Sequence, residues 1–273
     1  NLFFKKQNMK KKSLAVKKII HKSLLKYLNN HKINNIYKEY TVNLNKYLNK
    51  NDNLAVAVSG GPDSLALAYL TKCYELKNNI NSKFFIVDHG LRKDSLKEAK
   101  SVKQLLNKFN IFCEILKWKG KKPESNIQSI ARNERYKLLK KACKKKKIKN
   151  LLIGHHIDDL YENFFIRLLR GSGLKGLSSF GEPIKEENNL IILRPLIKCK
   201  KEDLIYISKK VFNFFVEDPS NYDENFKRTR IRSLITNLEF EGLDKQKLEL
   251  TIKNLKDSDN AINFYVKNNI EKN

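Results

Sequence analysis

The sequence predicts an α/β fold, in which a mostly parallel sheet carries helices on both faces and a helical segment follows it. Two observations predict this fold. Short runs of apolar, β-branched and aromatic residues alternate with stretches of helical periodicity between residues 54 and 170. Each short polar or glycine-rich motif falls at the end of such an apolar run or just after it. Alternation of this kind is typical of parallel sheets, whose ligands bind at the carboxyl ends of the strands.

The first half of the predicted sheet comes from two strand–helix pairs. LAVAV (54–58) is a continuous apolar run, as expected of a buried strand, and Ser64 to Leu76 has helical periodicity. FFIVD (84–88) predicts a second strand, followed by a helix from Ser95 to Phe109.

The second half repeats the pattern. FCEILKW (112–118) alternates like a strand, and a long helix is expected from Asn126 to Lys147. LLIG (151–154) predicts a fourth strand, with a helix from Asp158 to Arg170. After Leu190 the pattern changes to ILRPLI and a helix from Lys200, and residues 227–270 read as helical with mixed charge.

Charge is distributed unevenly along the chain. The formal net charge is +27, yet residues 1–150 hold 36 Lys and Arg against 10 Asp and Glu, which is nearly the whole excess. We therefore expect a basic extension over residues 1–50, a catalytic-type domain over 51–225 and a helical segment over 226–273. A one-sided excess is the footprint of a polyanion-binding face, with a solvated Lys-rich surface as the alternative. Nucleic acid is favoured over a membrane, because no segment pairs its lysines with a sustained apolar face.

The compartment is indicated by the cysteines and the chain start. The cysteines Cys73, Cys113, Cys143 and Cys199 stand far apart without a CxxC pair, which favours buried thiols in a reducing compartment over a zinc site. The Lys-rich first stretch lacks the apolar core and cleavage site of a secretory signal. We expect a cytoplasmic protein, and an organelle of bacterial descent stays an alternative.

The motif Ser59-Gly60-Gly61-Pro62-Asp63-Ser64 lies between the first predicted strand and its helix. Glycines there let the backbone turn tightly and bring N–H groups close to an anion, to which the helix N-terminus adds partial positive charge. The two hydroxyls can hydrogen-bond phosphate oxygens, and Asp63 can hold Mg²⁺. Because the motif lacks the lysine of a P-loop, we expect it to bind the pyrophosphate end of a nucleotide. The plain alternative is a capped strand–helix turn.

The second chemical motif follows the fourth predicted strand. In LLIGHHIDDLYENFFIRLLRGSGLKGL (151–177), the spacing of His155, Asp159 and Glu162 predicts that all three share one helical face. One imidazole and two carboxylates could bind a cationic amine and a metal–nucleotide. GSGLKG (171–176) matches a dinucleotide fingerprint, but it follows a helix and no acid stands about 20 residues later. A glycine-rich helix terminus is the better interpretation.

These motifs carry a family resemblance that spans roughly residues 50–235. SGGPDS resembles the pyrophosphate loop of the N-type ATP pyrophosphatases, which have a Rossmann-like fold of the adenine-nucleotide alpha-hydrolase type. GHHIDDLYEN with RLLRGSGLKGL resembles the tRNA(Ile)-lysidine synthetases, as do VDHGLR (87–92), Arg194-Pro195-Leu196 and DPSN (218–221). The resemblance implies ATP-dependent ligation of lysine to the wobble cytidine of the tRNA(Ile) with anticodon CAU, through an adenylated cytidine.

The resemblance also implies roles for individual residues. It implies ATP contacts from Ser59, Gly60, Gly61, Pro62, Asp63, Ser64, His89 and Arg132, with Asp63 near Mg²⁺. Asp159 and Glu162 would bind lysine, and His155 is a candidate for the adenylation step. Arg135, Arg228 and Arg232 would face RNA. The chain departs from the family where Arg-Asn-x-x-Arg is replaced by Arg228-Thr229-Arg230-Ile231-Arg232 and where a following proline is missing.

Two other functions stay open at this level. A tRNA thiolase of the same fold would need cysteines that carry sulfur or a cluster, and no CxxC pair is present. A non-catalytic RNA-binding module would keep the basic face, with no reason to keep SGGPDS together with His155, Asp159 and Glu162. The sequence also leaves open a homodimer.

Overall fold

The computed structural model describes residues 23–49, 52–91, 94–120, 123, 127–216, 223 and 225–270. Contacts divide the chain into two units, one formed by Asn1–Gly154 with Pro183–Val216 and the other by His155–Glu182 with Glu217–Asn273. This division rests on contacts, and the boundaries expected at residues 50 and 225 stay a prediction. Each unit is described by itself.

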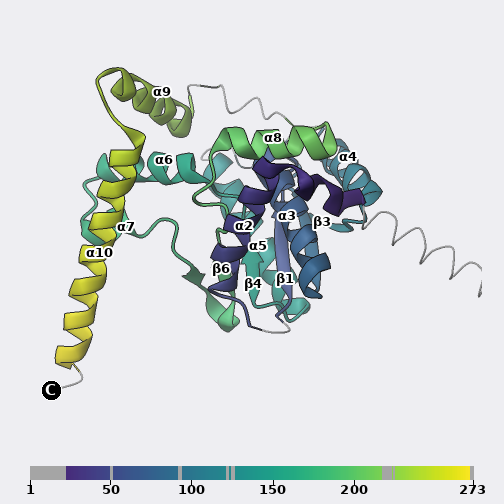
Figure 1. Cartoon of the computed structure of the whole chain (residues 1–273), viewed down its shortest axis with the longest axis horizontal. Helices are drawn as coiled ribbons and strands as arrows, with labels where there is room; N and C mark the ends of the chain where they lie inside the picture. The colour runs from purple at the N-terminus through teal and green to yellow at the C-terminus, as the bar shows by residue number, and fades with distance from the viewer. Residues whose placement is uncertain are drawn as a thin grey trace, which may run out of the picture. The chain divides into compact units, whose positions relative to one another are not determined.

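The first unit is built on a six-stranded sheet in the order β3-β2-β1-β4-β6-β5 (Figure 1). Its strands are β1 (Leu54–Val58), β2 (Ser82–Asp88), β3 (Cys113–Lys117), β4 (Asn150–Leu152), β5 (Ile184–Lys185) and β6 (Ile191–Leu193). All neighbours pair in parallel except β5, which runs antiparallel to β6. The four strands predicted from the sequence are confirmed. The chain leaves β1 toward β2 and returns to β4 on the other side, so the topological switch point lies at the carboxyl ends of β1 and β4.

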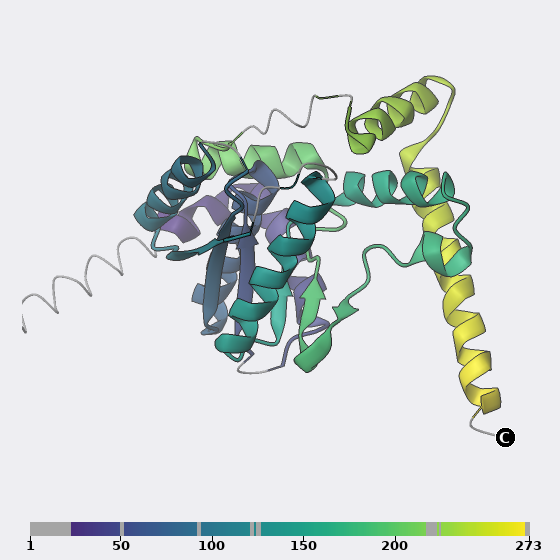
Figure 2. The ribbon, with the colours of Figure 1, turned by 180° about the vertical axis from the view of Figure 1, so that it is seen from behind.

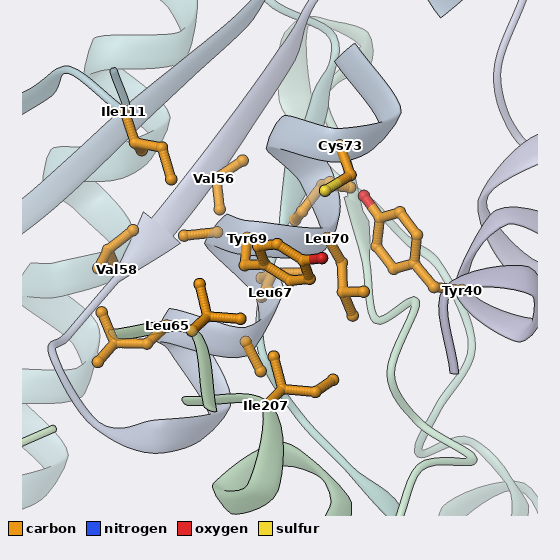
Figure 3. Packing of buried hydrophobic residues seen from close by; sticks show 14 of the residues in the cluster. Tyr40, Val56, Val58, Leu65, Leu67, Tyr69, Leu70, Cys73, Ile111 and Ile207 are labelled. Atoms are coloured by element: carbon orange, nitrogen blue, oxygen red, sulfur yellow. The ribbon is translucent and has the colours of Figure 1, made fainter. Parts of the chain in front are cut away.

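Helices cover both faces of this sheet, as predicted. One face carries α2 (His31–Asn45), α3 (Pro62–Asn78), α4 (Ser95–Lys108) and α8 (Lys201–Phe212), whose apolar side chains share a core with Leu54, Val56 and Val58. Figure 3 shows the centre of this core, where Leu65, Leu67 and Leu70 pack beside the strand residues. On the opposite face lies α5 (Ile127–Lys145) (Figure 2). Its Leu139 and Cys143 pack in one cluster with Ala55 and Phe85. The alternation of β1 side chains between the two cores is the period-two pattern of a strand.

Helix α2 belongs to this core, in a stretch where the sequence predicted a basic extension. Ile33, Ile36, Tyr37, Tyr40 and Leu44 are buried in it. Two tyrosine hydroxyls form hydrogen bonds between α2 and α3. Tyr40 Oη lies 2.9 Å from Thr71 Oγ1, and Tyr74 Oη donates to Asn45 Oδ1 at 2.6 Å. Tyr37 and Tyr40 stand at helical spacing with the buried aliphatic residues of α2, so its apolar face is present in the sequence among Lys and Asn residues.

The second unit contains only helices among its described residues. They are α6 (Ile157–Leu168), α7 (Leu174–Ser178), α9 (Lys227–Phe240) and α10 (Lys245–Ile270). Its apolar cluster joins Ile157, Tyr161 and Phe165 of α6 to Ile231 of α9 and Ile252 of α10. Two short 3₁₀ helices, Tyr27–Asn29 and Glu187–Asn189, belong to the first unit. None of the helices in the described residues has the length and apolar character that crossing a membrane requires.

Candidate active site

The loop after β1 is organised by the hydroxyl of Ser64. Ser64 Oγ accepts hydrogen bonds from the backbone N–H groups of Ser59 and Gly60, both at 3.1 Å, and donates to the carbonyl of Gly61 at 2.9 Å. Ser64 Oγ therefore takes up both of these N–H groups and closes the loop at the N-terminus of α3. The helix start itself contributes the partial positive charge that suits an anion.

Gly60 is a position where only glycine fits. Its φ is +92°, and a Cβ added there would lie 2.6 Å from Val102 Cγ2 and 3.1 Å from Val216 Cγ2. The carbonyl of Gly60 also accepts a hydrogen bond from Val216 N at 2.9 Å. Both the backbone conformation and the close packing exclude a side chain, so this glycine fixes the shape of the loop.

Two neighbouring elements hold the first turn of α3. Ser208 of α8, which is fully buried, donates its hydroxyl proton to the carbonyl of Pro62 at 2.7 Å. Just beyond β4, a Cβ on Gly154 would come within 3.1 Å of the Asp63 carbonyl carbon and oxygen. The carboxyl ends of β1 and β4 thus meet at this turn, which is the switch point at which open α/β sheets bind ligands. Sequence reasoning missed Ser208.

The carboxylate of Asp63 has a cationic partner that sequence reasoning also missed. Lys201 Nζ, in the first turn of α8, lies 3.0 Å from Asp63 Oδ2. Both side chains are partly exposed, at 37% for Lys201 and 23% for Asp63. The pair therefore lies where solvent and solutes can reach it.

The loop after β2 brings two predicted site residues together. Arg135 Nε donates to His89 Nε2 at 3.2 Å, which joins the middle of α5 to this loop. Buried Asp88 stabilises the loop, because its Oδ1 accepts from Gly90 N at 3.1 Å and from Ser95 Oγ at 2.7 Å. Arg135, predicted to face RNA, lies beside a residue predicted to bind the nucleotide.

Arg132 packs along its own helix. Its guanidinium lies 5.3 Å from the ring centroid of Tyr136, and Nη2 is 3.4 Å from the Tyr136 hydroxyl. Its predicted contact with ATP stays a prediction.

In the second unit, the helix that carries the acidic motif begins later than its spacing suggests. The three residues His155, Asp159 and Glu162 were expected on one helical face, but α6 starts at Ile157 and His155 precedes it. Asp159 caps the helix start, accepting a hydrogen bond from His156 N at 3.0 Å. Asp159 and Glu162 do share a face, since they are three residues apart within the helix.

Two arginines of α9 pair with these carboxylates. Arg232 Nε donates to Glu162 Oε1 at 2.5 Å. Arg228 Nη1 lies 3.5 Å from Asp159 Oδ1 and 3.9 Å from Glu162 Oε2. The carboxylates are nearly buried, at 8% and 3% exposed, whereas the arginine side chains are 36% and 41% exposed. The unit thus gathers four predicted site residues into one ion-pair cluster, which leaves part of each guanidinium accessible.

Burial and charge move the pKa values of the two carboxyls in opposite directions. Burial alone would raise the pKa of Asp159, but His156, His155, the His156 N–H and Arg228 lower it below its ordinary value. Burial raises the pKa of Glu162, and the charge of Asp159 adds to this, despite the opposing effect of Arg232. Glu162 is therefore the stronger base of the two.

The glycine-rich stretch after α6 is a helix terminus, as the sequence indicated. Gly171 has φ of +70° just beyond the last turn. Arg167 anchors the following turn by donating to the carbonyl of Gly176 and to Ser179 Oγ. This geometry is that of a helix end closed by a left-handed glycine.

The cysteines are inert. Cys73, Cys113, Cys143 and Cys199 are all unpaired and buried. Burial raises the pKa of each thiol to about 12. Because the thiolate is the nucleophile and metal ligand, these four residues are poorly suited to carry sulfur or a cluster.

Comparison with known proteins identifies the family. A model described as a PP-loop domain matches residues 26–239. The chain is 38% identical to a tRNA(Ile)-lysidine synthase of Bradyrhizobium diazoefficiens over 197 residues, which is 71% of this chain and 54% of that protein. It is 36% identical over 227 residues to one of Rickettsia felis, covering 82% of this chain and 51% of that protein. The chain thus spans about half the length of these relatives.

Among solved structures, the fold is similar to that of the U34-tRNA thiolase NcsA from Methanococcus maripaludis with its [4Fe-4S] cluster. The TM-score is 0.70 at 21% sequence identity, covering 83% of this chain and 79% of that one. At this identity the likeness concerns the fold, and it agrees with the α/β fold predicted from the sequence.

Proposed function

This chain belongs to the PP-loop domain family, and we propose that it uses ATP to ligate lysine to the wobble cytidine of the tRNA(Ile) with anticodon CAU. The observation that carries the proposal is the similarity to lysidine synthases, at 36% identity over 227 residues in one relative. Because the chain spans about half of such relatives, activity, substrates and partners are proposals for this chain.

The first proposed step takes place at the loop after β1. The 2-carbonyl oxygen of the cytosine would attack the α-phosphorus of ATP, forming adenylated cytidine and releasing pyrophosphate. The start of α3 supplies partial positive charge for the departing pyrophosphate, and the N–H groups of Ser59 and Gly60 would reach it on exchanging their bonds to Ser64 Oγ. His89 and Arg135, joined at 3.2 Å, offer further donors.

Mg²⁺ fits this site through the nucleotide. Within the described residues, no three His, Cys, Asp or Glu side chains gather into a metal site. Asp63 offers a carboxylate at the loop, and one carboxylate together with nucleotide phosphates is an ordinary set of ligands for Mg²⁺. Bound there, the ion would offset phosphate charge during adenylation.

The second proposed step uses the acidic cluster of the second unit. The ε-amine of lysine would attack C2 of the adenylated cytidine, and AMP would leave with the former carbonyl oxygen. Lysine has a pKa of about 10.4 in water, so its amine must lose a proton before it attacks. Glu162, whose pKa is raised by burial, is our candidate for taking that proton, and Asp159 for holding the amine. His155 is our candidate for assisting adenylation.

The proposed RNA partner agrees with the charge of the first unit. Lys144, Lys145 and Lys147 are exposed at the end of α5 and its following turn. Such lysines bind phosphates without reading sequence. A cytoplasmic site of action follows from a tRNA substrate and a reducing compartment, and is part of the proposal.

Of the other functions, a thiolase is disfavoured by the four buried thiols with pKa values of about 12. A non-catalytic RNA-binding module is disfavoured by the geometry of the loop after β1. Gly60 adopts a conformation that only glycine fits, and binding of an RNA backbone alone does not require such a loop.

The test is incubation of the purified chain with ATP, Mg²⁺, labelled lysine and an unmodified CAU-anticodon tRNA(Ile), followed by nucleoside mass spectrometry. We expect lysidine at the wobble position, lost without ATP and in Asp63→Ala. The matched control is Asp94→Ala, which removes an exposed carboxylate at the start of α4 that caps no N–H. ATP cleavage without lysine incorporation would point to another nucleophile, and equal activity in both variants would refute the role of the loop.

A further inference from the structure

The ion pair between Asp63 and Lys201 joins the proposed nucleotide loop to α8. The two charged atoms are 3.0 Å apart, and the residues are 138 positions apart in the sequence. The carboxylate also lies in the first turn of α3, where a helix N-terminus stabilises a negative charge.

The pair is not needed to hold α8 in place. Leu204 and Ile207 are fully buried in the core, and Ser208 is hydrogen-bonded to the Pro62 carbonyl at 2.7 Å. A partly exposed ion pair adds little to such a contact, about 0–1 kcal/mol. The ion pair of Lys201 therefore contributes little to the packing of α8, so we look for the role of its charge at the loop.

The backbone on both sides of the pair is fixed, whereas the lysine side chain can move. Ser208 holds the Pro62 carbonyl, and the close approach of Gly154 holds the backbone of Asp63. Lys201 carries its ammonium on a flexible four-carbon chain that is 37% exposed. Any exchange of partners at Asp63 can therefore happen at the side-chain level, without moving the loop.

A carboxylate beside a phosphate-binding loop raises an electrostatic problem. Without a counter-ion, Asp63 would repel the phosphates that the loop binds, since like charges a few Å apart are unfavourable. We propose that Lys201 is the built-in counter-ion of Asp63 and that Mg²⁺ takes its place beside the carboxylate when the metal–nucleotide binds. This inference rests on the proposed ATP site and goes beyond it by making Lys201 a positioning residue for nucleotide binding.

The proposal predicts a specific change in Mg²⁺ dependence. In Lys201→Met, binding of metal-free ATP weakens, because Asp63 loses the nearby ammonium charge. Half-saturation by Mg²⁺ in the presence of ATP shifts to a lower concentration, by about fivefold, because the metal no longer competes with an ammonium. Lys201→Arg keeps the charge and stays close to the unsubstituted chain.

The experiment is equilibrium dialysis of the full chain with labelled ATP, in EDTA and across a Mg²⁺ titration, so that no catalytic activity enters the readout. Lys200→Met is the control, because it removes an exposed lysine one residue away. The same titration in an Asp63→Asn background completes a double-mutant cycle, and there Lys201→Met should leave the Mg²⁺ midpoint unchanged.

Equal loss of ATP affinity with and without Mg²⁺, or an unchanged Mg²⁺ midpoint, would overturn the proposal and leave Lys201 as a simple contact. Failure of the counter-ion proposal can be told apart from failure of the proposed function. If the unsubstituted chain binds no ATP with or without Mg²⁺, the nucleotide site itself is refuted, and the counter-ion role with it.

Discussion

The pairing of Glu162 with Arg232 makes a strong prediction about stability. Glu162 is 3% exposed and receives the Arg232 Nε–H at 2.5 Å. Among the described residues, Arg232→Met would leave this carboxylate with the more distant Arg228, at 3.9 Å. Removing one partner of a buried ion pair costs about 4 kcal/mol. Because the Arg232 side chain is 41% exposed and water screens it, we expect about half, a loss of ~2 kcal/mol near neutral pH.

The loss should depend on pH in a defined direction. Burial raises the pKa of Glu162, so the folded state favours the protonated carboxyl. The stabilisation from this protonation is complete below the ordinary carboxyl pKa and is lost as pH rises through the folded-state pKa. Removing Arg232 raises the folded-state pKa further, so the cost of Arg232→Met should shrink as pH falls from about 7 to about 5.

The assay is urea unfolding followed by circular dichroism at both pH values, with the slope of the transition compared between variants. Arg230→Met is the control, because Arg230 is an exposed arginine of the same helix. Adding Glu162→Gln to Arg232→Met should recover most of the loss by removing the buried charge. A cost for Arg232→Met no larger than that of Arg230→Met, or one that grows on acidification, would refute the reasoning.

Three further predictions concern the first unit. Gly60→Ala should abolish ATP binding and lower the midpoint of thermal unfolding, because its Cβ would lie 2.6 Å from Val102 Cγ2 in a left-handed conformation; normal ATP binding would contradict this. Ser208→Ala removes the hydrogen bond to the Pro62 carbonyl and should cost about 1 kcal/mol in urea unfolding, with Ser101→Ala on the exposed side of α4 as the control. The four cysteines, with thiol pKa values raised to about 12, should not react with a thiol reagent at mildly alkaline pH until urea is added. Rapid labelling of any one in the native chain would be the contrary result.

Local sequence patterns predicted the elements whose conformation is determined by residues close together in the sequence. LAVAV forms β1 with the predicted bounds, because a five-residue apolar run that ends at a glycine turn is typical of a buried strand and too short for a helix. The turn after it was predictable for the same reason, since Gly60 sits at a φ that its neighbours cannot adopt. The left-handed end of α6 at Gly171 is a similar case.

What the sequence left undetermined depends on contacts between distant positions. Lys201 and Ser208 meet the loop across separations of 138 and 146 residues, and no local spacing indicates such partners. Arg228 and Arg232 have helical spacing that suits an RNA-facing surface, yet they pair with carboxylates about 70 positions away. His155 was placed on the helical face by spacing alone, whereas the side chain of Asp159 caps the backbone of His156 and sets the helix start.

The most direct test of the proposed reaction follows one oxygen atom. A CAU-anticodon tRNA(Ile) carrying ¹⁸O at the 2-carbonyl of its wobble cytosine would be incubated with the chain, ATP, Mg²⁺ and lysine. We expect lysidine together with AMP that has gained the ¹⁸O label, one labelled AMP for each lysidine formed. Unlabelled AMP, or ATP cleavage that leaves the cytidine unchanged, would contradict the claim that this PP-loop protein activates the cytosine carbonyl for attack by lysine.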